Sequence, residues 1–182
     1  MITNDKLKLI LPYIGIPIIT IALFFIQLGH IDIFILLLFE LITVFGYVST
    51  VIDIKSKRIS NNLILAMIGT WILMIIPKLL LDIDSTVIFL KDSVFGFLIG
   101  GGIFLVVYLI SRKGLGGGDV KFMAAAGLYL GFERTLSAML YGTVLAGLAG
   151  LMLLLLKKLG RKDTMPLAPF LYIGILITVF YR

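Results

Sequence analysis

The stretch TVIFLKDSVFGFLIGGGIFLVVYLISRKGLGGGDVKFMAAAGLYLG, residues 86–131, decides the fold class of this 182-residue chain. It begins with an apolar run long enough to cross a hydrocarbon core of about 30 Å as a helix. The short basic turn SRKGLGGGD separates that run from a second apolar run. Similar runs recur along the whole sequence, of which 60% is hydrophobic. A soluble domain of this length cannot bury so much apolar surface, so the sequence predicts an all-α, polytopic transmembrane bundle.

Apolar runs predict a bundle of about six to seven helices joined by short polar turns. The predicted segments cover approximately residues 7–28, 32–52, 62–81, 86–111, 119–132, 134–156 and 165–181. The fifth segment rises only ~21 Å as a helix, which is less than the hydrocarbon core. We therefore keep two interpretations of this segment, a span within the bundle and a re-entrant segment.

The N-terminal run has no small-residue cleavage site, so we interpret residues 1–30 as a retained transmembrane helix ahead of a core of residues 31–182. With a cytoplasmic N-terminus, most of the sixteen Lys and Arg residues lie on the inner side. Four lie on the outer side: Lys78, Lys91, Arg134 and Arg182. This bias predicts an inner N-terminus and an outer C-terminus in the cell membrane.

The composition excludes several kinds of chemistry. The chain has no cysteine and one histidine, His30. Cysteine nucleophiles, cysteine-ligated zinc sites and H-E-x-x-H metalloprotease sites are therefore excluded, and we predict neither a metal nor a cofactor. The net charge of +6 follows from membrane topology, so no nucleic-acid partner is predicted. Acid–base chemistry in this chain has to rely on carboxyl groups.

Two aspartates are predicted at the cytoplasmic boundary: Asp53 ends the second segment and Asp119 opens the fifth. Each has a structural explanation when taken alone. Asp119 can cap a helix, and Asp53 can pair with nearby lysines. A helix cap does not need the three glycines at positions 116, 117 and 118. Three residues without Cβ allow the backbone to approach a neighbouring helix or an extended peptide closely. Two carboxyl groups that meet in a low-dielectric cleft share one proton, which suits aspartyl hydrolysis.

Glu40 lies inside the second segment, where an ionisable residue suggests function. It precedes Asp53 by thirteen residues, ~20 Å along a helix, so it cannot belong to the same site. We favour packing of a protonated or hydrogen-bonded Glu40 within the bundle and keep a direct role as the alternative.

At these residues the chain resembles a known family. GLGGGD, residues 114–119, is similar to the G-x-G-D signature of type IV prepilin peptidases, polytopic aspartic proteases that include archaeal preflagellin peptidases. DIKSKRISN, residues 53–61, is similar to the family pattern D-x5-I-P-N, with Ser60 at the proline position. Pro166 and Pro169 resemble its late proline-rich segment. The resemblance covers roughly residues 40–175.

The resemblance implies removal of a short basic leader from a pilin-like precursor, at the bond just before its hydrophobic helix and on the cytoplasmic side. Asp53 and Asp119 would be the catalytic pair. The expected site-shaping residues are Gly116, Gly117, Gly118, Lys121 and Asn61. Lys121 follows Asp119 by two residues and either acts on that carboxylate or extends to the headgroups.

Some family members also methylate the new N-terminus through an added domain with C-x-x-C pairs. This chain has no cysteine and no room for such a domain between its first two segments, so we expect a peptidase alone. The expected partners are the precursor, membrane lipids and, as an option, a second copy of the chain.

Two other functions stay open. The first is a general intramembrane protease resembling the presenilin-like G-x-G-D enzymes, although those place both aspartates within spans. The second is a proton-coupled carrier that uses Glu40, Asp53 and Asp119. Such carriers often contain internal repeats or helices broken at mid-membrane, and the sequence shows no repeat between its halves.

Overall fold

The computed structural model describes residues 11–111, 115–157 and 165–181. Residues 7–10 of the first predicted segment lie outside these ranges. The same is true of several basic residues on which the predicted orientation rests: Lys6, Lys8, Arg112, Lys113, Lys158, Arg161, Lys162 and Arg182.

Helices form nearly all of the described chain, and the described residues contain no strand, which confirms the all-α prediction. The elements are the 3-10 helix η1 (Leu11–Tyr13) and the helices α2 (Gly15–Gln27), α3 (Ile33–Ser56), α4 (Asn61–Leu81), α5 (Ile83–Ser111), α6 (Gly117–Leu155) and α7 (Ala168–Phe180). Four of them, α3 to α6, are long and apolar enough to cross a membrane. The chain is an integral membrane protein.

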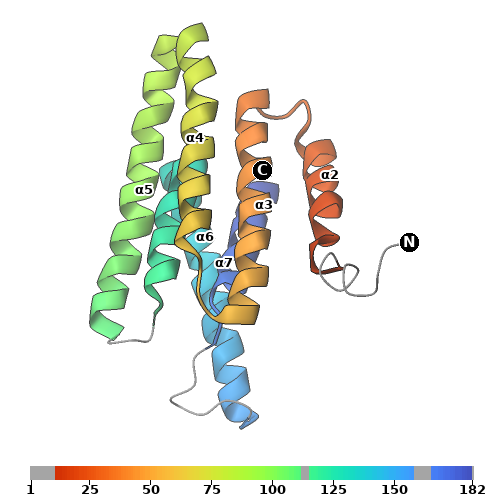
Figure 1. The fold of residues 1–182 in the computed structure, drawn as a ribbon, viewed down its shortest axis with the longest axis vertical. Coiled ribbons are helices and arrows are strands. Elements are labelled where there is room, and N and C mark those ends of the chain that lie inside the picture. Colours follow the sequence, from red (N-terminus) through yellow and green to blue (C-terminus); the bar gives the residue numbers. More distant parts are fainter. Residues whose placement is uncertain (1–10, 112–114, 158–164, 182) are drawn as a thin grey trace.

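The helices alternate in direction (Figure 1), and short turns join α2 to α3, α3 to α4 and α4 to α5. Helices α2 and α7 both pack on α3, while α4 and α5 form an antiparallel pair. The most extensive packing joins α5 to α6, and α7 lies against both α3 and α6. As a result, the end of α3, the start of α6 and the start of α7 meet at one end of the bundle.

Helix α6 reverses direction at Gly131. Its residues are helical except Gly131, which has φ 73° and ψ −174°. Met123 in the first half and Thr135 in the second half both lie against Gly100 of α5. The two halves therefore run side by side in opposite directions (Figure 1). The fifth and sixth predicted segments are the two arms of this hairpin, with Gly131 as their boundary.

The short first arm is surrounded by protein, because residues 122–131 are all buried. Glycine accepts the positive φ at the reversal without strain from a Cβ atom. The amide of Phe132, at the start of the second arm, donates a hydrogen bond of 3.0 Å to Oδ1 of Asp92 on α5. Non-helical backbone within a membrane is tolerated where protein satisfies its polar groups. The shortness of the first arm is therefore explained by its burial.

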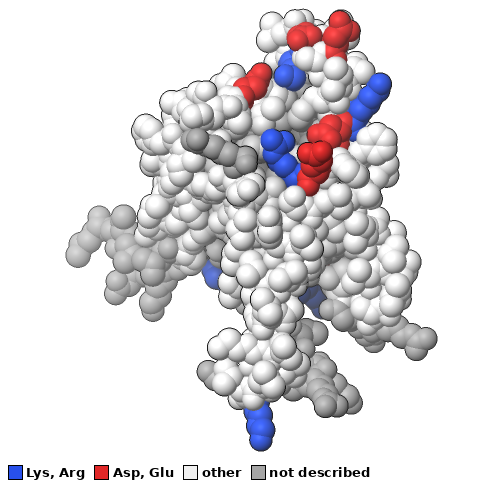
Figure 2. All heavy atoms as spheres, turned by 180° about the vertical axis from the view of Figure 1, so that it is seen from behind, with Lys and Arg blue, Asp and Glu red and all other residues white. Residues whose placement is uncertain are grey.

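Acidic side chains concentrate at one end of the bundle. Figure 2 shows them gathered there on the visible face together with several basic side chains, whereas the charged side chains visible toward the opposite end are basic. The acidic group comes from the turns beyond α2 and α4 and from the Gly131 reversal, and it comprises Asp32, Asp82, Asp84, Asp92 and Glu133. Asp53 and Asp119 lie toward the basic end, where α3 ends and α6 begins.

Glycines hold the α5–α6 contact together, as their spacing in FGFLIGGG predicts. A Cβ atom at Gly96 would collide with the carbonyl oxygen of Gly127, and one at Gly127 with that of Gly96. A Cβ atom at Gly100 would collide with the Met123 carbonyl, whereas one at Gly102 would have no atom within 4 Å.

We expect Gly100→Ala to lower the stability of the protein in detergent by about 1–3 kcal/mol, because the added methyl forces α5 and α6 apart. Gly102→Ala is the matched control. It should leave the midpoint of thermal unfolding unchanged or raise it, since alanine is preferred over glycine inside a helix. Equal midpoints for the two variants would contradict the close backbone contact at Gly100.

Candidate active site

Asp53 lies in the last turn of α3 and is buried, with 5% of its surface exposed. Its Oδ2 atom accepts a hydrogen bond of 3.0 Å from the backbone amide of Ala168, the first residue of α7. Amides in the first turn of a helix have no partner within that helix, and they attract negative charge. The proline-containing start of α7 therefore supplies a donor to a carboxylate 115 residues earlier in the chain.

Asp119 lies in the first turn of α6 and is also buried, with 8% exposed. Its Oδ2 atom accepts a hydrogen bond of 3.2 Å from the amide of Gly116, and its own amide donates to the Gly116 carbonyl at 3.1 Å. The residue at the cap position is therefore Gly116, and Asp119 reaches back to it from three residues further on. This exchange fixes the direction of the carboxyl group relative to the helix axis.

The structure places the two carboxyl groups at the same end of the bundle. The end of α3 and the start of α6 share one end of the bundle (Figure 1), and Asp53 is close enough to Asp119 to interact with it electrostatically. Two like charges in such a buried place repel each other, so the pair favours a state with one proton between its two members. A carboxylate and a carboxylic acid side by side can act as base and acid in one reaction.

The three glycines before Asp119 have different surroundings. A Cβ atom at Gly118 would lie 3.1 Å from Cβ and 3.2 Å from the backbone nitrogen of Ile59. At Gly116 the added atom would lie 2.8 Å from the Asp119 carboxylate, and at Gly117 no atom lies within 4 Å. Only Gly118 is therefore required for packing against another element, the turn between α3 and α4.

Lys121 and Asn61 meet beside this turn, because Nζ of Lys121 donates a hydrogen bond of 2.9 Å to Oδ1 of Asn61. Ser60 precedes Asn61 and caps α4: its hydroxyl oxygen accepts a hydrogen bond of 3.3 Å from the Asn62 amide. Serine therefore forms this turn without the proline of the family pattern. The contact from Lys121 links the start of α6 to the start of α4.

Glu40 is not part of this arrangement. It lies near the middle of α3 and lines an apolar cleft with Thr20, Phe24 and Phe25 of α2. Both of its carboxyl oxygens are buried without a hydrogen-bond partner among the described residues. Glu40 therefore lies away from the aspartate pair, and of the two forms that we favour, protonated or hydrogen-bonded, the hydrogen-bonded form finds no partner among the described residues.

Sequence reasoning missed the two backbone amides that hold the carboxyl groups, those of Gly116 and Ala168. The signals were present, because glycines before Asp119 and prolines around position 168 mark the starts of helices. It also missed Asp92, whose carboxylate caps the second arm of α6.

Comparisons with known proteins place these residues in context. A sequence model described as the type IV leader peptidase family matches residues 40–151, which include both aspartates and more than half of the chain. Three curated relatives are each named prepilin leader peptidase/N-methyltransferase. No solved structure matches the chain.

The relative from Bacillus subtilis is 31% identical over 94 residues, which cover 50% of this chain and 38% of that protein. The relative from Pectobacterium carotovorum is 33% identical over 142 residues, which cover 71% of this chain and 46% of that protein. The relative from Escherichia coli is 28% identical over 137 residues, which cover 72% of this chain and 57% of that protein. The matched part of this chain thus corresponds to roughly half of each relative's length.

The hydrogen bond from Ala168 makes a prediction about stability. Asp53→Ala leaves a buried amide without a partner, so we expect a loss of about 1–3 kcal/mol in the free energy of unfolding. Asp53→Asn keeps an acceptor oxygen for this amide, so its free energy of unfolding should fall by less. The measurement is thermal unfolding in detergent, and a wild-type midpoint for Asp53→Ala would argue against the contact between α3 and α7.

Proposed function

Since the chain belongs to the type IV leader peptidase family, we propose that it is a membrane aspartic endopeptidase that removes the short basic leader from pilin-like precursors. The class includes prepilin, pseudopilin and preflagellin. The observation that carries the proposal is that two buried carboxyl groups, Asp53 and Asp119, from helices far apart in sequence lie within electrostatic range of each other. Each is held by a backbone amide at the start of a helix.

Hydrolysis follows from one proton shared by the pair. The ionised carboxylate takes a proton from water while the water oxygen attacks the carbonyl carbon of the scissile peptide. The neutral carboxyl group gives its proton to the carbonyl oxygen. The tetrahedral diol then collapses: the C–N bond breaks, the leaving nitrogen takes a proton from the first carboxyl group, and a diol hydroxyl returns a proton to the second. The two roles belong to the pair and are not assigned to either residue.

We propose that this site faces the cytoplasm. The described basic residues at the same end of the chain's helices as the aspartate pair are Lys55, Lys57, Arg58, Lys121 and Lys157. Basic residues next to transmembrane helices concentrate on the cytoplasmic side. A precursor whose leader stays in the cytoplasm would present its scissile bond at this end of the bundle.

We also propose that the chain does not methylate the product. Helix α2 ends at Gln27 and α3 begins at Ile33, so the turn between them has no room for an inserted domain. The sequence has no cysteine for C-x-x-C pairs. The relatives that are named as methyltransferases extend well beyond the matched part of this chain.

The other two functions have less support. A carrier that uses three acidic groups needs Glu40 on the same path as Asp53 and Asp119, but Glu40 lines the α2–α3 cleft instead. A general intramembrane protease needs both aspartates well inside their spans. Asp53 is in the last turn of α3, and the basic residues Lys55, Lys57 and Arg58 follow at once.

The decisive test is cleavage in liposomes of a precursor with a basic leader and an apolar helix of about twenty residues. We expect Asp53→Asn and Asp119→Asn each to lower the cleavage rate by about 10²-fold or more, because each removes one partner of the acid–base pair. Mass spectrometry would read leader release and the unmethylated new N-terminus.

Asp84→Asn is the control for these variants, because Asp84 is exposed and lies at the other end of the bundle. It should cleave at the wild-type rate. Full activity in either variant of the aspartate pair would overturn the assignment.

The glycine surroundings give a second prediction for the same assay. A side chain at position 118 displaces the start of α6 from Ile59 and moves Asp119, and a misplacement of about 1 Å can cost 10²-fold in rate. We expect Gly118→Leu to lose most of its cleavage activity and Gly117→Leu to keep most of it, because position 117 is open. Equal activities in the two folded variants would show that this packing does not position the carboxyl group.

A further inference from the structure

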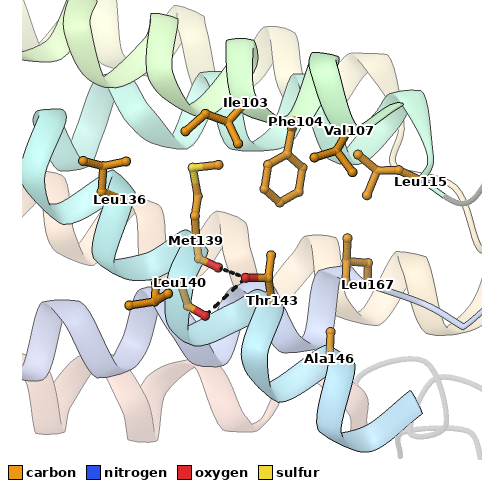
Figure 3. A pocket seen from close by; sticks show the side chains of 10 residues that line it. All are labelled: Ile103, Phe104, Val107, Leu115, Leu136, Met139, Leu140, Thr143, Ala146 and Leu167. Carbon is orange, nitrogen blue, oxygen red and sulfur yellow. Dashed lines mark hydrogen bonds between the residues drawn. The ribbon is translucent and has the colours of Figure 1, made fainter. Parts of the chain in front are cut away.

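An apolar groove of about 530 Å³ lies between the lower part of α5 and the second arm of α6. Ile103 and Val107 form one wall, and Leu140 and Thr143 form the other (Figure 3). Its size is within the range of ligand pockets in proteins.

One end of this groove adjoins the aspartate pair. Leu115 and Leu167 line that end. Leu115 directly precedes Gly116, whose amide binds the Asp119 carboxylate. Leu167 directly precedes Ala168, whose amide binds the Asp53 carboxylate. The groove therefore ends at the two backbone segments that hold the two carboxyl groups.

The groove suits an apolar occupant. Its one polar side chain is Thr143, and that hydroxyl donates to the carbonyl oxygens of Met139 (2.7 Å) and Leu140 (3.2 Å) within its own helix (Figure 3). The hydroxyl of Thr143 therefore already has hydrogen-bond partners and requires none from an occupant of the groove. Leu140 is 61% exposed and Val107 is 45% exposed, so the groove opens along the side of the bundle. A transmembrane helix could enter it from the lipid.

We propose that this groove binds the first turns of the apolar helix of the precursor, with the scissile bond at the aspartate end. This inference rests on the proposed function, in which cleavage occurs just before that helix. The continuity of the groove with the carboxyl-holding segments distinguishes this occupant from a lipid chain, for which the position relative to Asp53 and Asp119 has no importance. From Ala146 to Leu136 the lining spans ten residues of α6, or ~15 Å, so about three turns of the precursor helix bind there.

Because the chain has no cysteine, single-cysteine cross-linking tests the groove directly. Val107→Cys, which lines the groove, is compared with Leu105→Cys, which does not line it but has a similar exposed fraction (47% against 45%). Both are made in the Asp119→Asn background, so that the precursor stays intact. The probe is the liposomal precursor with one cysteine in the first turn of its apolar helix.

We expect about a tenfold higher yield of precursor cross-link at position 107 than at 105, because binding at close range raises the effective concentration of the two thiols. Equal yields would overturn the proposal, since lipid then occupies the groove. Cross-links between two copies of the chain in place of the precursor would also overturn it. Cross-linking does not require catalysis, so a cross-link without any cleavage by wild type would support the groove and reject the peptidase.

A kinetic comparison provides a second readout. Ala146→Leu fills the groove, whereas Ala149→Leu, three residues further along α6, lies outside its lining. We expect about a tenfold higher KM for the precursor in the first variant with a similar kcat, as the loss of binding in an apolar pocket predicts. If wild type cleaves and both variants have its KM, the groove inference fails while the proposed function stands.

Discussion

The hydrogen bond from the Ala168 amide to the Asp53 carboxylate joins the end of α3 to the start of α7. A second bond of the same kind, from the Gly116 amide to Asp119, forms within the first turn of α6. A carboxyl group buried beside a membrane needs hydrogen-bond donors, and the first backbone amides of a helix can serve because they have no partner within the helix. Much of the arrangement follows from this need: three helix ends meet in one place because two carboxyl groups have to be satisfied there.

The sequence was sufficient for everything that depends on local pattern. Apolar runs predicted the helices, and the spacing of Gly96 and Gly100 predicted a close helix contact. Asp53 and Asp119 were expected at one depth because the number of spans between them puts both at the same end.

The rest depended on contacts between distant parts of the chain. The sequence predicted a break between two segments at residues 132–134, but nothing local there says that Asp92, 40 residues earlier, accepts from Phe132. The partner of Lys121 was also unknown, because Asn61 is 60 residues away. The groove beside α5 was not expected at all, since it exists only where the second arm of α6 packs on that helix. Burial of the first arm likewise explains its shortness, which hydropathy alone could not.

The end of α6 projects beyond the ends of α3 and α5 as a spur of leucines (Figure 1). Leu148 is 60% exposed and Leu155 is 76% exposed, and Lys157 follows. At roughly 25 cal/mol per Å² of apolar surface, this spur is far more stable in hydrocarbon than in water. Acyl chains should therefore follow the spur to the level of Lys157, while Lys55, Lys57 and Arg58 hold the aspartate pair at the level of the headgroups. The bilayer then has to deform around the spur, and the water consumed in each hydrolysis reaches the pair from the headgroup layer.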